Sequence, residues 1–117
     1  MCVWCAYAGD QQAAPLLWES LRKIEGLWGG YYTGLVTMDE NGLHWEKCVG
    51  CTEVWQKQFQ LKDFPGCAGL AHSRTPSGGD EHRAHPFVGT SPNWSATHHR
   101  GKSTRFTWYT FLHPLCF

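Results

Sequence analysis

The spacing of apolar residues in the first quarter of the chain predicts a strand followed by a helix. Residues 3–8 (VWCAYA) are β-branched, aromatic and small, which predicts a buried strand close to the amino terminus. We expect a helix over residues 14–25, because apolar residues there share one face and charged residues take the other. The apolar stripe of that helix consists of Leu17, Leu21, Ile24 and Trp28.

The next segment predicts a β-hairpin. Residues 31–38 and 43–48 both have the composition of strands. The dipeptide Asn41-Gly42 between them is typical of a type I′ turn, which needs two residues that tolerate positive φ. We therefore expect the two strands to pair directly.

A second helix is expected over residues 51–61, and a short strand of small residues over 67–73. The order of elements is then strand, helix, strand, strand, helix, strand. This order predicts an α+β domain in which the helices cover one face of a largely antiparallel sheet.

Composition and charge restrict the possible functions. The 117 residues suffice for one domain, and ten basic residues balance ten acidic ones, so charge gives no reason to expect a nucleic-acid or membrane partner. No apolar stretch is long enough to span a bilayer, and the first twenty residues lack the features of a signal peptide. We therefore expect a cytoplasmic protein whose six cysteines are reduced.

The cysteines leave a metal site open as an alternative. Cys2-x-x-Cys5 and Cys48-x-x-Cys51 form a CxxC…CxxC pattern, which is typical of a four-thiolate zinc module. The gap between the pairs is longer than in a compact zinc ribbon, and a strand over residues 2–8 would point Cys2 and Cys5 to opposite faces. We favour buried thiols for Cys5, Cys48, Cys51 and Cys67.

Cys2 lies where the chain could use its own amino terminus in catalysis. Removal of Met1 would leave Cys2 as the first residue, with a free α-amine. An α-amine has a pKa of about 7.7–8.0, so near neutral pH it can accept the proton of the thiol. One residue would then supply both a nucleophile and its general base.

Two segments resemble class II glutamine amidotransferases, which are N-terminal-nucleophile (Ntn) hydrolases. "MCVWCAYAGD" and "LWGGYYTG" resemble the opening of that domain, with Gly29 and Gly34 on the two glycines of the family's "YRGYDSAG". "GLAHSRTPSGGDEHRAHPFVG" resembles the family's glutamine-binding loop, "HTRWATHG…AHPH". The resemblance covers residues 1–89 and implies an incomplete αββα sandwich.

The resemblance also implies the chemistry and the residues that perform it. Cys2 would attack the side-chain amide of glutamine, and Arg74 would hold the α-carboxylate of the substrate. No cofactor is implied, and any ammonia would pass to an acceptor domain or a synthase partner. His72 and His85 are expected to anchor the loop. The remaining substrate-binding residues implied are Thr75, Ser77 and Gly78.

The last part of the chain departs from the family's pattern. The family's oxyanion hole contains an Asn-Gly pair; Gly101 could be its glycine, but Arg100 stands where asparagine is expected. Val3 replaces the glycine that follows the nucleophile, where a β-branched side chain could crowd the substrate. We therefore divide the chain into a partial amidotransferase domain, 1–89, and a divergent tail, 90–117. A poor glutaminase and a catalytically silent remnant are both compatible with this division.

Overall fold

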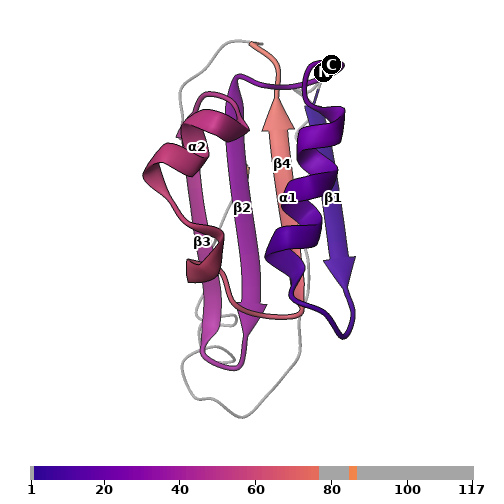
Figure 1. Cartoon of the computed structure of the whole chain (residues 1–117), viewed down its shortest axis with the longest axis vertical. Coiled ribbons are helices and arrows are strands. Elements are labelled where there is room, and N and C mark those ends of the chain that lie inside the picture. The colour runs from indigo at the N-terminus through magenta and orange to yellow at the C-terminus, as the bar shows by residue number, and fades with distance from the viewer. Residues whose placement is uncertain (1, 77–84, 87–117) are drawn as a thin grey trace, which may run out of the picture.

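A computed structural model describes residues 2–76 and 85–86, and within them the expected α+β organisation is confirmed. Within the described residues, four strands form a single sheet, and two α-helices and one 3₁₀ helix connect them (Figure 1). In chain order the elements are β1 (Cys2–Ala8), α1 (Ala13–Ile24), β2 (Tyr32–Asp39), β3 (Gly42–Val49), α2 (Thr52–Gln58), η1 (Leu61–Asp63) and β4 (Ala68–Arg74).

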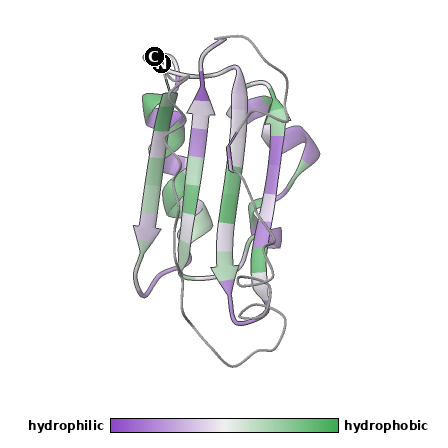
Figure 2. Cartoon of the chain, turned by 180° about the vertical axis from the view of Figure 1, so that it is seen from behind, coloured by the Kyte–Doolittle hydropathy of each residue, from purple (hydrophilic) through white to green (hydrophobic). Residues whose placement is uncertain are grey.

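The sheet has the strand order β1-β4-β2-β3, and every neighbouring pair is antiparallel. The last strand therefore lies between the first two, with Ala71 directly opposite Cys5 on one side and Leu35 on the other. Both α-helices cover the same face of this sheet (Figure 1). We call the opposite side the open face, because neither α-helix covers it. Figure 2 shows this face, with the helices behind the strands.

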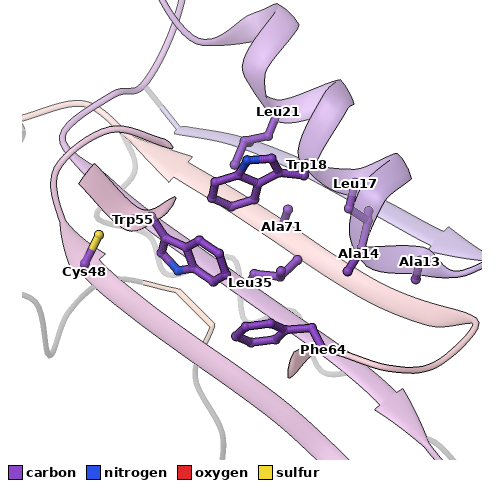
Figure 3. Close-up of a cluster of buried hydrophobic side chains, with 10 residues drawn as sticks. All are labelled: Ala13, Ala14, Leu17, Trp18, Leu21, Leu35, Cys48, Trp55, Phe64 and Ala71. Carbon is purple, nitrogen blue, oxygen red and sulfur yellow. The ribbon is translucent and has the colours of Figure 1, made fainter. Parts of the chain in front are cut away.

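The hydrophobic core lies between the helices and the sheet (Figure 3). At its centre the ring of Trp55 lies 4.4 Å from that of Trp18 and 5.1 Å from that of Phe64, measured between centroids. Such aromatic pairs combine large apolar burial with favourable ring geometry. The buried residues of this cluster are Ala13, Ala14, Leu17, Trp18, Leu21, Leu35, Cys48, Trp55, Phe64 and Ala71.

The apolar stripe expected on the first helix was only partly right. Leu17 and Leu21 are buried as expected, but Trp28 lies beyond the end of α1 and is 45% exposed. Trp18, which the stripe omitted, is buried instead, because the helix packs on both the sheet and α2. A helix between two neighbours buries a wider face than a single stripe suggests.

The hairpin forms, but its turn lies one residue earlier than expected. Asp39 pairs with Gly42, so Glu40 and Asn41 form the two-residue loop, and Gly42 is the only one of these with positive φ. The Asp39 carboxylate accepts a hydrogen bond from the backbone N–H of Asn41 at 2.8 Å. An aspartate that binds the backbone two residues ahead closes a turn without residues of positive φ in the loop.

The second helix is shorter than the expected 51–61. It ends at Gln58, and the extended backbone of Phe59 and Gln60 leads into η1. This break allows both Phe59 and Phe64 to pack against Trp55, each with its ring centroid 5.1 Å away. Apolar contact with Trp55, made by the buried Phe64 and the half-buried Phe59, offsets the loss of one further helical turn.

The two helices are joined by a side-chain cap. The carboxylate of Glu25, just after α1, accepts hydrogen bonds from the backbone N–H of Thr52 at 2.9 Å and from the Thr52 hydroxyl. Thr52 opens α2 and is fully buried. A carboxylate at a helix amino terminus satisfies otherwise unpaired N–H groups and complements the helix dipole.

We therefore expect Glu25→Ala to lower the free energy of unfolding by about 1–2 kcal/mol. Urea denaturation followed by tryptophan fluorescence would measure this loss. Glu19→Ala is the matched control, because Glu19 lies on α1 in an exposed ion pair with Lys23 and should give no measurable change. Equal effects of the two substitutions would show that the cap contributes nothing.

Over the described residues, no helix has both the length and the apolar character needed to cross a membrane.

Candidate functional site

Three residues from three neighbouring strands form one row across the open face. Strand pairing places Cys2 of β1 directly opposite Arg74 of β4, and Arg74 directly opposite Tyr32 of β2. Residues that oppose each other in antiparallel strands point to the same face, with their Cβ atoms about 4.5–5.5 Å apart. Cys5, Ala71 and Leu35 oppose one another in the same strands and face the helices. Successive side chains in a strand point to opposite faces, and each residue of the row lies three positions from one of these core residues. The side chains of the row therefore point away from the helices.

The Arg74 side chain is held at this position by packing. It is only 9% exposed, and its guanidinium carbon lies 5.3 Å from the centroid of the Tyr32 ring. Tyr32 is itself 8% exposed, so the cation and the ring meet in a largely desolvated place. From the sequence, only the family resemblance indicated that Cys2 and Arg74 belong to one site. In the structure, the pairing of β1 with β4 makes them direct neighbours.

Val3 does not lie on the side of the sheet that carries Cys2. It pairs with Ser73 and packs against the core cluster under the helices. Its side chain therefore points to the opposite face from the thiol of Cys2, and the expected crowding of a substrate beside Cys2 is not supported.

The glycines of "LWGGYYTG" contact the strand that carries Arg74. Gly29 and Gly30 have φ of +90° and +93°, and the Gly30 N–H donates a hydrogen bond to the Ser73 hydroxyl at 2.8 Å. A Cβ atom at Gly29 would lie 2.8 Å from the Cβ of Ser73, closer than such atoms approach in proteins. The backbone N–H of Tyr31 also donates to the Arg74 carbonyl at 2.9 Å. Only glycine allows this loop to approach the end of β4 so closely.

Gly34 has a comparable role beside His85 and Pro86. A Cβ atom there would overlap the backbone of His85 and lie 2.6 Å from the Cδ of Pro86. Gly34 is paired with His72, whose ring lies 4.4 Å from the ring of His85, measured between centroids. The two segments that carry the family resemblance therefore meet in space on the open face.

His72 is buried in an environment that excludes the charged imidazolium. It is 3% exposed, and its Nδ1 atom has no hydrogen-bond partner among the residues that the structure describes. Burial, followed by the nearby His85 and Arg74, lowers the pKa of His72 from 6.5 to about 3. A histidine with such a pKa is neutral at physiological pH and serves as a packing element rather than a proton carrier.

The expected site residues beyond Arg74 lie mostly outside the described residues. Thr75 follows β4 directly and is half-buried, close to the row. Ser77, Gly78 and Gly101 fall in the undescribed segments, so their expected roles stay predictions. Tyr32 was not foreseen, because nothing in the sequence indicates which residue faces Arg74 across the sheet.

The alternative zinc site finds no common location among the described cysteines. Cys2 lies on the open face, whereas Cys5 and Cys48 face the helices and contribute to the core. Of the thiols expected to be buried, only Cys48 is fully so; Cys5 and Cys51 are half-buried, and Cys67 is exposed just before β4. Burial raises the pKa of the Cys5 thiol, which disfavours the thiolate that zinc requires. No group of three or more cysteine, histidine or acidic side chains suited to a metal ion occurs within residues 2–76 and 85–86.

Comparison with known proteins gives a consistent result. No family model matches the chain. Several relatives named glutamine–fructose-6-phosphate aminotransferase (isomerizing) do match it. The protein from Gluconobacter oxydans is 30% identical over 74% of this chain, that from Methanosarcina acetivorans 31% over 86%, and that from Methanosarcina mazei 34% over 74%.

These matches cover only a small part of each relative. The aligned segment amounts to 14% to 16% of the length of those three aminotransferases. A match to 74% of this chain has the length expected if only residues 1–89 align. The match to 86% of the chain is longer than residues 1–89, so it includes part of the segment that we expected to diverge.

Proposed function

We propose that this chain, whose N-terminal part is related to the class II glutamine amidotransferase region of glutamine–fructose-6-phosphate aminotransferases, uses that part to bind glutamine and cleave its side-chain amide. The observation that carries the proposal is the pairing of Cys2 with Arg74 on one face of the sheet. A nucleophile and a guanidinium side by side match the two ends of glutamine, an amide carbon and an α-carboxylate.

The proposed reaction begins with the thiol of Cys2. Once Met1 has been removed, the α-amine of Cys2 accepts the thiol proton, and the sulfur attacks the amide carbon of glutamine. The proton then passes to the departing nitrogen, which leaves as ammonia, and a glutamyl thioester remains on Cys2. Water hydrolyses the thioester to glutamate and restores the thiol.

Arg74 would orient the substrate for this attack. A guanidinium binds a carboxylate through two parallel hydrogen bonds, which fix both the position and the direction of the ligand. Arg74 is largely desolvated, so its interaction with a carboxylate is stronger than that of an exposed arginine. Thr75 adjoins it, and the proposal extends to Ser77 and Gly78, which follow it in the sequence.

The sheet and helices also fit part of an Ntn-hydrolase sandwich. Such a sandwich packs a second sheet against the first, and here the open face carries Trp4, which is 53% exposed, and Trp45, which is 41% exposed. Since the chain spans 14% to 16% of its relatives, the acceptor of the ammonia would belong to a further domain or a synthase partner.

The proposal can be tested by labelling the purified chain with 6-diazo-5-oxo-L-norleucine, a diazoketone analogue of glutamine. We expect intact mass spectrometry to show loss of Met1 and one adduct, on Cys2, whose formation free glutamine blocks. Cys67 is an internal control, because it is an exposed thiol that iodoacetamide should label with or without glutamine. Retention of Met1 without an adduct, or an adduct that glutamine does not block, would contradict the proposed function.

A further inference from the structure

The row of Cys2, Arg74 and Tyr32 contains one residue to which the proposed reaction assigns no role. Tyr32 faces Arg74 across the β2–β4 pairing, on the side away from Cys2. We propose that Tyr32 is a positioning residue that orients the Arg74 guanidinium toward the α-carboxylate of glutamine. This inference rests on the proposed function, because it assigns a role within the same site.

The geometry supports a specific interaction between the two side chains. The guanidinium carbon of Arg74 lies 5.3 Å from the centroid of the Tyr32 ring, within the range of a cation–π contact. Both side chains are at least nine-tenths buried. The attraction between a cation and a ring face is larger where water is excluded, so this contact restricts the guanidinium more than a surface contact would.

An aromatic ring suits this role better than an acidic side chain would. Arginine has several rotatable bonds and loses considerable conformational entropy when it is fixed in one orientation. A carboxylate in place of Tyr32 would fix the guanidinium, but it would also compete with the carboxylate of the substrate for the same N–H groups. A ring attracts a cation through its face and, unlike a carboxylate, does not compete with a substrate carboxylate for the N–H groups at the edge of a guanidinium.

The position of Tyr32 is itself secured by its neighbours. It begins β2 and pairs with Arg74 on one side and Val49 on the other, so its backbone is fixed within the sheet. The preceding residue, Tyr31, is 53% exposed. Its N–H donates to the Arg74 carbonyl and its own carbonyl accepts from the Gly50 N–H, while its ring centroid lies 6.5 Å from that of Tyr32. The Tyr31 ring is exposed, whereas the Tyr32 ring is buried against the Arg74 guanidinium, so the two adjacent tyrosines provide a matched pair for experiment.

The test compares the rates at which two reagents label Cys2 in the full chain. The diazoketone carries the α-carboxylate of glutamine, whereas iodoacetamide has none. We expect Tyr32→Met to slow labelling by the diazoketone about tenfold and to leave labelling by iodoacetamide unchanged. Tyr32→Phe, which keeps the ring, and Tyr31→Leu, which removes the exposed ring, should both behave like the unmodified chain.

The outcomes separate this inference from the function on which it rests. If glutamine protects Cys2 in the unmodified chain but Tyr32→Met reacts with the diazoketone at the unmodified rate, the positioning role is overturned and the proposed function stands. Equal slowing of both reagents would also overturn it, because a purely structural defect has that effect. If glutamine gives no protection even in the unmodified chain, both proposals fail. Tyr32→Leu offers a second ring-free variant if Tyr32→Met does not fold by circular dichroism.

Discussion

Cys2→Ser is expected to lower the rate of glutamine hydrolysis by at least about a thousandfold, because it removes the proposed nucleophile. Serine is nearly isosteric with cysteine, so the β1–β4 pairing should persist. Its hydroxyl is far less acidic and a weaker nucleophile than a thiol, so the same α-amine activates it much less effectively near neutral pH. Release of ammonia from glutamine, measured with a coupled dehydrogenase, would record the loss.

Cys5→Ser is the matched control for this prediction. Cys5 lies on the same strand but faces the helices, opposite Ala71, so the reaction should not require its thiol. We expect this variant to keep the unmodified rate of hydrolysis. A zinc module built from the two CxxC pairs predicts instead that both substitutions damage the protein equally. Comparable activity of Cys2→Ser and the unmodified chain would exclude Cys2 as the nucleophile.

The pattern of apolar residues was sufficient to predict the elements of the fold. Residues 3–8 and 14–25 correspond closely to β1 and α1. The first strand was expected to be buried, but β1 lies at the edge of the described sheet and its residues are half-buried or exposed. The errors lie where a single side chain decides the local structure. The Asp39 carboxylate closes the hairpin turn one residue earlier than expected. Phe59 and Phe64 both pack against Trp55, and α2 therefore ends at Gln58.

The strand order could not be predicted from the same pattern. The sequence indicated antiparallel strands, but not that β4 would lie between β1 and β2. That order is what places Arg74 between Cys2 and Tyr32. Cys2 and Arg74 were identified through the family resemblance, whereas Tyr32 depends on register across two strands far apart in the chain. A non-local pairing of this kind leaves no signal in the spacing of residues along one segment.

The pH dependence of stability should reveal the buried histidine on the open face. Burial, His85 and Arg74 lower the pKa of His72 to about 3, whereas an unfolded chain has a histidine pKa of 6.5. Between these values the unfolded chain binds a proton at this imidazole that the folded chain does not. The free energy of unfolding is therefore fully retained above about pH 6.5 and falls as the pH decreases toward 3.

The size of this effect follows from the linkage between proton binding and folding. Each pH unit below 6.5 removes about 1.4 kcal/mol, so lowering the pH to 4.5 should cost about 2–3 kcal/mol from His72 alone. Urea denaturation of the unmodified chain at several pH values would measure the slope. His72→Phe keeps a planar ring at the same place but cannot bind a proton, so we expect it to reduce the slope between pH 6.5 and 4.5.

His44→Gln is the control for the loss of a histidine elsewhere in the sheet. His44 is half-buried and its Nε2 lies 2.9 Å from the Asp39 carboxylate, which remains ionised across this pH range because the His44 hydrogen bond holds the pKa of Asp39 below its usual value. This variant should keep the steep slope of the unmodified chain. If His72→Phe and His44→Gln retain the same slope, the stability of the fold does not depend on a neutral His72. A reduced slope in His72→Phe alone would identify the buried imidazole of His72 as an acid-sensitive group on the open face.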